Sequence, residues 1–550
     1  MQVVDDVLPY TPIRDLEAAG SVILAILIVG FPIVLGLSWF LELTPPAVRR
    51  ELPAEEFPSA RPSMEHLRSD SVAVLPFANL SESADNEYFS DGITDDIIAA
   101  IAHVRGLRVM SRTSVWRYKG TDRAMAEIAA ALGTATIVTG SVRRSGSRVR
   151  IFAEVVDARS EDMLWSDTYE RELEDIFEIQ SEVAAQVARA VQQELTVSDA
   201  ARIASRGTTN PEAYDIYLKA RFLWNQRTGP AIAESLGYFE RALELDPDFA
   251  LAYSGLAEAH TVRGLYGMES PTTVFEAAKD AADEALRLDP MLGEAVAAKA
   301  CVAGIFDWDW EVAERGFWKA FELAPSYPTA RQWYAMNILT PHAKFTEAKE
   351  ELSRASELDP GSRAIAIGDG IIAFYARDYG AAHEELEAVR WREPDFSLAH
   401  FFLGQCYAAQ GDDDRAIDSL EEAVKLAGES SETLGMLGYA YGRVSRTTES
   451  EAVLDRLRQR AERRYVSPVL FAQVLIGLGR HDDALAELAE AAKVSATDLI
   501  WLAVRPLYDP VRDRDEFQAV LEEVDLRVGL RDKAGARAKR EAPDDATTPS

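Results

Sequence analysis

The sequence predicts a multidomain chain in which a transmembrane helix, a small α/β domain and an all-α superhelical solenoid follow one another. Three observations support this fold class: residues 18–41 carry no charge, strand-like and helix-like patterns alternate over residues 71–195, and prolines recur at a nearly constant interval after residue 246. The predicted parts are a membrane anchor, a linker, the α/β domain, the repeat array and a disordered tail, at residues 1–45, 46–70, 71–195, 210–525 and 530–550.

The composition argues against one class of partner. The 550 residues include 91 acidic and 58 basic side chains, and the formal net charge is −33. Because such a chain repels phosphate backbones, we expect no nucleic acid partner and favour basic segments of other proteins. The two cysteines, Cys301 and Cys406, fall within helical patterns, where a thiol packs as a small apolar group. They support neither a disulfide framework nor a metal site, and no cofactor is expected.

The uncharged segment at residues 18–41 is long enough to cross a membrane. At about 1.5 Å per residue it makes a helix of roughly 36 Å, against a hydrocarbon layer of roughly 30 Å. A cleaved signal peptide is the alternative, but that needs a basic leader, and the leader here carries Asp5 and Asp6. One arginine closely precedes the span and three follow it, so we expect the C-terminal side to face the cytoplasm, with the periplasm as the alternative.

The α/β domain is predicted from short runs with two different periods. Apolar runs of strand length occur at residues 71–77, 107–111, 136–142 and 149–156. Helical patterns open at Ser90 and cover residues 124–132 and 173–195. Strands interleaved with helices over this length predict one sheet covered by helices.

Six ordered motifs in this stretch carry a resemblance to a known family. They are VAVLPF, YFSDGIT, GLRV, RTS, GSVR and a tryptophan, at residues 72–77, 88–94, 106–109, 112–114, 140–143 and 165. The stretch resembles the TolB-like N-terminal domain that many bacterial proteins carry immediately before tetratricopeptide repeats. In that architecture a membrane hairpin often ends in Gly-Phe-Pro and Leu-Thr-Pro, as at residues 30–32 and 43–45, which implies a bacterial inner-membrane protein. Because another helix comes first there, we expect residues 1–9 to be the end of a missing helix and the start to be truncated or misassigned.

Two groups of polar side chains in this domain are candidate sites. A basic aromatic patch could bind an anionic ligand, although a strand end with partly buried rings explains it equally; it consists of Arg112, Trp116, Tyr118 and Lys119. An acidic group could hold a cation, although we favour capping of a helix start; it consists of Asp91, Asp95 and Asp96. No phosphate-binding loop or nucleophile elbow occurs, so no catalytic residue is predicted.

From residue 210 the chain shows a helical pattern that repeats. Prolines end successive helix pairs at spacings of 43, 35, 35 and 34 residues, at Pro247, Pro290, Pro325, Pro360 and Pro394. The 34-residue period is that of tetratricopeptide repeats (TPRs), in which each repeat is one helix pair. Five residues before the first four prolines stand alanines, where two helices approach closely: Ala242, Ala285, Ala320 and Ala355.

The clearest repeat lies between residues 399 and 428. Its small and bulky residues keep the spacing of the family at Gly404, Tyr407, Ala416, Leu420 and Ala423. Because one helix pair cannot bury its own apolar face, we expect about eight pairs to stack into a superhelix whose groove receives proteins or peptides. Two tryptophans interrupt the plain repeat, and we expect them either to join adjacent repeats or to contact a partner: Trp308 and Trp310.

These features predict a non-catalytic, membrane-tethered scaffold for protein–protein interaction through a TPR groove. A second hypothesis is the regulatory arm of a signalling system whose effector half lies on another chain. The pairing of a TolB-like domain with repeats resembles the arms of some bacterial adenylate cyclases and transcription regulators. A hydrolase or transferase lacks support, because the seven histidines are scattered along the chain and no small-molecule substrate is evident.

Overall fold

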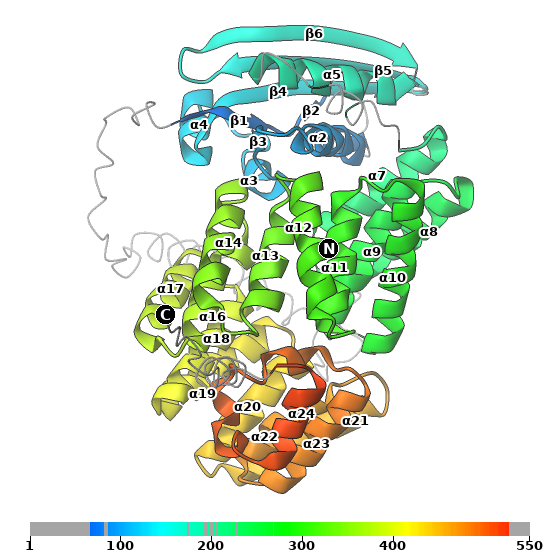
Figure 1. The fold of residues 1–550 in the computed structure, drawn as a ribbon. Helices are drawn as coiled ribbons and strands as arrows, with labels where there is room; N and C mark the ends of the chain where they lie inside the picture. Colours follow the sequence, from blue (N-terminus) through cyan, green and yellow to red (C-terminus); the bar gives the residue numbers. More distant parts are fainter. Residues whose placement is uncertain are drawn as a thin grey trace, which may run out of the picture. The chain divides into compact units, whose positions relative to one another are not determined.

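The computed structural model describes residues 67–526, apart from residues 82–85, 173–174, 192–195, 197–202, 204–206, 227 and 268. The described chain contains a domain built on one sheet, followed by a long array of helices (Figure 1). Both belong to one compact unit that begins at Met64. The predicted membrane anchor, most of the predicted linker and the predicted tail lie outside the described residues.

The sheet domain alternates strands and helices, as the sequence predicts. Its strands are β1 Arg68–Val74, β2 Ala78–Asn79, β3 Arg108–Val109, β4 Thr134–Ser145, β5 Arg148–Asp157 and β6 Asp162–Glu172. Its helices are α2 Glu87–Ala102, α3 Arg112–Trp116, α4 Met125–Leu132 and α5 Ile176–Val191.

The sheet is mixed, with strand order β3-β1-β4-β5-β6 and β2 beside β4. β1 runs parallel to β3 and β4, so that Val72 stands beside both Val109 and Thr136. β4, β5 and β6 are antiparallel. The turn between β4 and β5 contains Gly146 at φ +62°, a left-handed conformation that glycine adopts without steric cost.

Three elements differ from the sequence-based expectation. β6 was missed because Tyr169 alone of its 11 residues is buried, and so the strand has no apolar alternation. α2 begins at Glu87 rather than at Ser90. The expected strand end at Arg112 is instead helix α3, because the Ser111 side chain accepts a hydrogen bond from the Ser114 amide and caps a helical turn.

Eight helix pairs follow in the described chain. Their first helices are α7 Pro211–Asn225, α9 Ala250–Leu265, α11 Gly293–Ile305, α13 Pro328–Tyr334, α16 Gly368–Tyr375, α18 Ser397–Gln410, α20 Ser431–Arg443 and α22 Pro468–Gly477. Their second helices are α8 Gly229–Leu245, α10 Pro271–Leu288, α12 Trp310–Leu323, α14 Phe345–Leu358, α17 Tyr379–Arg392, α19 Asp413–Leu426, α21 Thr447–Ala461 and α23 His481–Lys493. The π-helix η5 Ala335–Leu339 continues α13, and the short helix α15 Arg363–Ala366 precedes α16.

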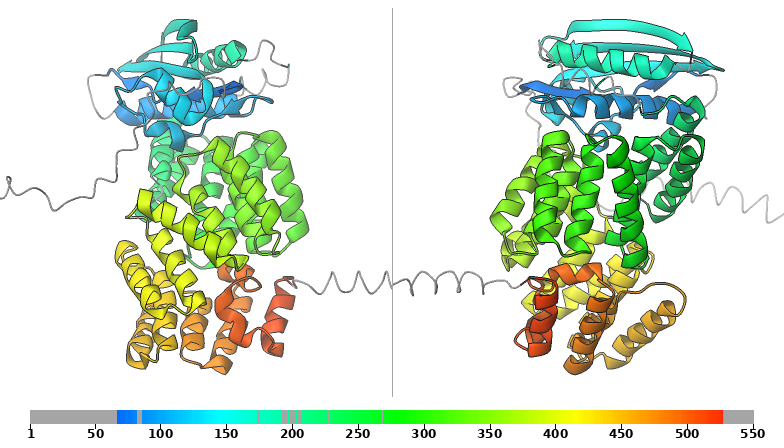
Figure 2. Two further views of the ribbon diagram at one scale, coloured as in Figure 1. Left: turned by 90° about the vertical axis from the view of Figure 1, so that its left-hand side faces the viewer. Right: turned by 45° about the vertical axis from the view of Figure 1, so that its right-hand side comes forward.

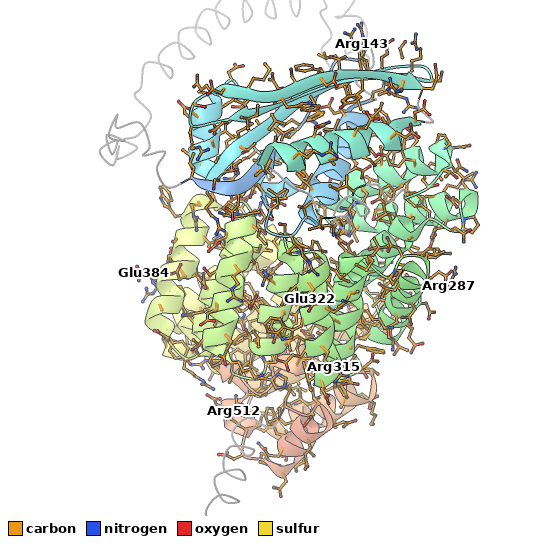
Figure 3. All side chains as sticks on the ribbon, turned by 45° about the horizontal axis from the view of Figure 1, so that its top comes forward. Arg143, Arg287, Arg315, Glu322, Glu384 and Arg512 are labelled. Atoms are coloured by element: carbon orange, nitrogen blue, oxygen red, sulfur yellow. The ribbon has the colours of Figure 1, made fainter. Side chains whose placement is uncertain are left out.

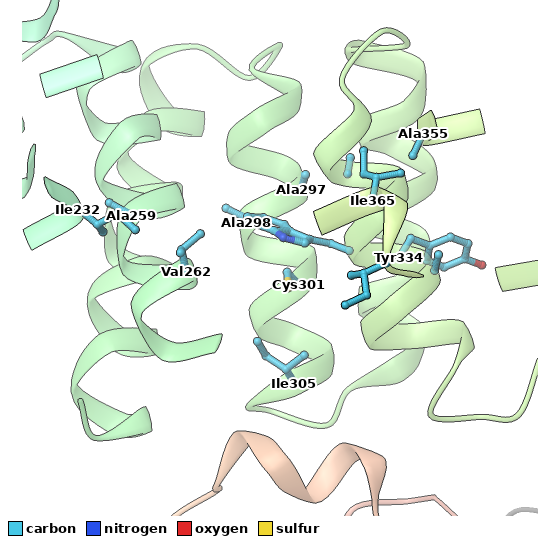
Figure 4. Close-up of a cluster of buried hydrophobic side chains, with 14 of the residues drawn as sticks. Ile232, Ala259, Val262, Ala297, Ala298, Cys301, Ile305, Tyr334, Ala355 and Ile365 are labelled. Carbon is cyan, nitrogen blue, oxygen red and sulfur yellow. The ribbon is translucent and has the colours of Figure 1, made fainter. Parts of the chain in front are cut away.

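The array has an inner and an outer side. The first helices of successive pairs contact each other, α9 with α11, α11 with α13 and α20 with α22, so they line the inner side of its curve (Figure 2). The second helices lie outside, where charged side chains such as Arg287, Arg315 and Glu322 project into solvent (Figure 3). Between the helices small residues such as Ala297 and Ala298 alternate with larger ones such as Tyr334 (Figure 4).

The array ends in a part that is not a helix pair. After α23 the chain forms two 3₁₀ helices and one α-helix: η6 Thr497–Trp501, η7 Pro506–Val511 and α24 Asp515–Glu523. We call residues 494–526 the C-terminal segment. Its apolar side chains are buried, among them Leu499, Leu507, Tyr508 and Phe517.

The predicted fold class requires a correction. Among the described helices, none combines the length and apolar character needed to cross a membrane. The longest of them, α10, has 18 residues and carries charged side chains in every turn. The predicted span at residues 18–41 lies outside the described residues. The fold class is therefore a mostly helical repeat solenoid with a small sheet domain, without the transmembrane helix as a component.

Candidate interaction groove

The repeat residues singled out from the sequence lie where helices cross. Seven of them are completely buried: Ala242, Ala285, Ala320, Ala355, Ala416, Leu420 and Ala423. Tyr407 is 7% exposed. A methyl group added at Gly404 would lie 2.6 Å from Cγ of Leu420 and 3.1 Å from the carbonyl oxygen of Ala416. These residues therefore set the packing of α18 on α19 and of the equivalent pairs.

The basic aromatic patch lies between the sheet domain and the array, and its cations have carboxylate partners. The Arg112 guanidinium lies 3.3 Å from the centre of the Trp116 ring and forms an ion pair with Asp95. Lys119 Nζ donates to Asp91 Oδ1 at 2.6 Å, and Tyr118 is 8% exposed. An anionic ligand at this patch would have to compete with these carboxylates.

The α2 carboxylates do not cap the helix, contrary to the favoured interpretation. The N-cap is Asn86, so Asp95 and Asp96 lie more than two turns inside α2. Asp95 accepts a hydrogen bond from Asn225 Nδ2 at 3.0 Å, and Asp96 accepts one from Tyr214. Burial raises the pKa of Asp96 to about 7. Both carboxylates thus bind the sheet domain to α7.

A second contact joins the sheet domain to the fourth helix pair. Ser114 Oγ, in α3, donates to Asp359 Oδ1 at 2.8 Å and accepts from the Gly361 amide at 3.0 Å. The Ser111 amide donates to the Leu358 carbonyl oxygen at 2.9 Å. Burial raises the pKa of Asp359, which is 6% exposed. The sheet domain is therefore anchored on two separate repeats of one array.

The tryptophans of the interrupted repeat have different surroundings. Trp310 Nε1 donates to the Val524 carbonyl oxygen at 2.9 Å, and its ring meets the His342 ring edge-on at 4.6 Å between centres. Trp310 therefore connects the third helix pair to the C-terminal segment. Trp308 is half-buried, with φ +56° and no hydrogen-bond partner for Nε1 in the described part of the chain. A contact of either tryptophan with another protein stays a prediction.

The C-terminal segment covers much of the inner side of the array. Trp501 Nε1 donates to the Met336 carbonyl oxygen at 3.5 Å, and Thr497 Oγ1 donates to that of Gly264 at 3.4 Å. Arg377 donates two hydrogen bonds to Asp509, at 2.5 and 2.7 Å. The sequence analysis missed this arrangement, because the segment lacks the 34-residue pattern. The available signal was the pair of prolines Pro506 and Pro510, which break helical periodicity.

A series of inner-side positions lies under or beside this segment. Gln405, Tyr439 and Gln473 follow one another at intervals of 34 residues and occupy equivalent places on α18, α20 and α22. They are 2%, 6% and 1% exposed. Neither the amide nitrogen nor the amide oxygen of Gln405 has a hydrogen-bond partner among the described residues. A buried amide without a partner is costly and rare in folded proteins, which makes Gln405 a candidate binding residue.

A cavity of about 220 Å³ lies beside Gln405. Three successive repeats and the C-terminal segment supply its walls, through Phe374, Gln405, Ala408, Ala409, Met436, Tyr439, Pro506, Leu507 and Pro510. Charged and aromatic side chains complete it at Arg377, Tyr379, Arg443 and Asp509. Arg443 Nε donates to Asp413 at 3.1 Å, so both arginines already have carboxylate partners.

Two family models match this chain, one in each part. A tetratricopeptide repeat model matches residues 367–431, and the model of the HilA/YgeH-like transcriptional regulator, second domain, matches residues 68–186. The chain therefore contains TPRs and a HilA-like domain. The resemblance of the sheet domain to the TolB-like family stays a prediction.

Curated relatives share parts of the chain. "Putative adenylate cyclase 3" of Rhizobium meliloti (strain 1021) is 38% identical over 199 residues, which are 36% of this chain and 34% of that protein. Tetratricopeptide repeat protein 13 of Homo sapiens is 28% identical over 123 residues, 22% of this chain and 14% of that protein. The chain thus spans about a third or less of the length of these two relatives.

Solved structures with a similar arrangement include PilW, a widely conserved type IV pilus biogenesis factor, and yeast Tom70. PilW is 14% identical, with a TM-score of 0.31, and the match covers 40% of this chain and 98% of PilW. Tom70 is 15% identical, with a TM-score of 0.37, and the match covers 60% of this chain and 68% of Tom70.

Proposed function

We propose that this chain is a non-catalytic scaffold that binds another protein on the inner side of its TPR array. The observation that carries the proposal is the cavity beside Gln405, because side chains from three successive first helices line it. Stacked repeats form extended inner surfaces of this kind, and such surfaces are binding sites in repeat proteins. The C-terminal segment narrows this surface and so restricts which partners fit.

The absence of chemistry is part of the proposal. Burial raises the thiol pKa of Cys301 to about 12 and that of Cys406 to about 11, which disfavours the thiolate needed for nucleophilic catalysis. Burial also lowers the pKa of His260 to about 4, far below the range of an effective general base at neutral pH. In the described ranges, no group of three His, Cys, Asp or Glu side chains has a geometry that could hold a metal ion.

Photo-crosslinking in the cell of origin tests the scaffold. A photoreactive amino acid replaces Arg443, whose side chain lines the cavity and is 32% exposed. The matched control replaces Trp318, which is 52% exposed on the outer helix α12. We expect one dominant protein adduct, identified by mass spectrometry, from position 443 and none from position 318. Equal adducts from both positions, or none from either, would contradict the proposal.

A regulatory role is the second candidate function. It is favoured by the match to a transcriptional-regulator domain and by 38% identity to a protein named as an adenylate cyclase. The two junctions between the sheet domain and the array support it, because they offer a rigid path between a partner on the array and the sheet domain. The same cross-linking experiment discriminates: an adduct with a cyclase or DNA-binding protein supports regulation, and any other partner supports a plain scaffold.

A further inference from the structure

We propose that the cavity beside Gln405 binds one uncharged residue of an extended peptide segment, and that the Gln405 side-chain amide pairs with the main-chain N–H and C=O of that residue. This inference rests on the proposed function and specifies the chemistry of the partner. It assigns to Gln405 the role of reading the peptide backbone.

The first argument is the state of the Gln405 amide. The side chain is 2% exposed, and neither of its polar atoms has a partner among the described residues. The free energy of this buried, unpaired amide is high, and a ligand that supplies both a donor and an acceptor lowers it. Binding therefore gains more from Gln405 than an exposed amide would provide, since no bond to bulk water is lost.

The second argument is the geometry of the complementary group. A glutamine side chain offers one N–H donor direction and one carbonyl acceptor in a plane. In an extended chain, the N–H and C=O of one residue point to the same side, as in the hydrogen-bonded pairs of an antiparallel sheet. One glutamine can thus satisfy both groups of one extended residue. In an α-helix these groups are already used within the helix.

The third argument is size. The cavity of about 220 Å³ is too small for a helix, whose diameter with side chains is about 10–12 Å. One or two residues of extended chain fit instead. Phe374, Met436 and Leu507 provide apolar contacts for a side chain.

The fourth argument is charge. Both arginines of the cavity wall are already paired, Arg377 with Asp509 and Arg443 with Asp413. An acidic ligand residue would have to break these pairs, and a basic one would approach the two cations. An uncharged residue enters without either cost.

The experiment uses a minimal probe of this chemistry. The full chain is labelled with ¹³C at its nine methionine methyl groups, of which that of Met436 is 1% exposed and lines the cavity. The blocked tripeptide N-acetyl-Ala-Leu-Ala-amide is titrated and followed by methyl NMR. We expect a saturable shift of the Met436 signal. An analogue with N-methyl-leucine lacks the central N–H and should bind about tenfold more weakly.

A matched pair of variants isolates the amide. Gln405→Leu should weaken tripeptide binding about tenfold or more, and Gln410→Leu, at an exposed position of the same helix, should leave it unchanged. The N-methyl analogue keeps the test valid if Gln405→Leu alters the fold. The inference is overturned if the tripeptide leaves Met436 unshifted, or if neither N-methylation nor Gln405→Leu weakens binding. A partner cross-linked from position 443 together with either result would leave the scaffold standing and remove only the role of Gln405.

Discussion

Replacing glycine by alanine should have opposite effects at two helical positions of this array. Gly404 lies inside α18 against α19, and an added methyl group would stand 2.6 and 2.9 Å from Cγ and Cδ2 of Leu420. Leu420 is completely buried and has little room to move. Gly237 lies inside α8, and a methyl group there would meet no atom within 4 Å. Neither glycine needs a positive φ, so backbone conformation does not decide the outcome.

Two opposing terms set the magnitude. Alanine in place of glycine favours a helix by about 1 kcal/mol. Overpacking a closed contact costs about 1–3 kcal/mol, and this cost applies at Gly404 alone. Gly237→Ala should therefore stabilise its helix pair by about 1 kcal/mol, and Gly404→Ala should destabilise its own by about 1 kcal/mol when the overpacking cost is near about 2 kcal/mol.

Hydrogen exchange read by mass spectrometry measures both effects where they occur. Because each repeat contacts mainly its neighbours, changes in protection stay local. Amides of α18 and α19 should exchange about fivefold faster in Gly404→Ala, and those of α8 about fivefold more slowly in Gly237→Ala. If Gly404→Ala slows exchange as Gly237→Ala does, helix propensity alone governs and the close contact of α18 with α19 is wrong.

Three further changes test other parts of the structure. Ala416→Trp should cost at least about 1–3 kcal/mol, because Ala416 is 0% exposed against α18, and hydrogen exchange should show lost protection confined to α18, α19 and their neighbours. Trp310→Phe removes the donor to the Val524 carbonyl oxygen and should cost about 1 kcal/mol, seen as faster exchange in α24, whereas Trp318→Phe at the outer surface should not change it. Asp96 has a folded pKa raised to about 7 from 3.8, so its contribution to stability is complete below pH 3.8 and falls as pH rises to about 7; melting temperatures of Asp96→Asn should show a weaker decline across that window than those of the wild type.

The repeats and most of the sheet were predictable because their patterns are local and periodic. Residues such as Ala320 and Ala416 keep their place at a fixed distance from the end of each helix pair, and close packing allows little else there. β6 was not predictable, since an exposed edge strand shows no apolar alternation. The expected cytoplasmic placement depends on arginines outside the described residues and stays a prediction.

The groove shows why local patterns predict a binding surface only in part. The 34-residue interval places Gln405 and Gln473 on the inner side, where an open array would expose them to water. Whether they are exposed depends on residues far along the chain, because contacts such as Arg377 with Asp509 hold the C-terminal segment against the first helices. No periodicity encodes that contact. The same segment turns an open groove into a cavity of about 220 Å³, so the feature that the sequence concealed is the one that restricts the partner to an extended segment.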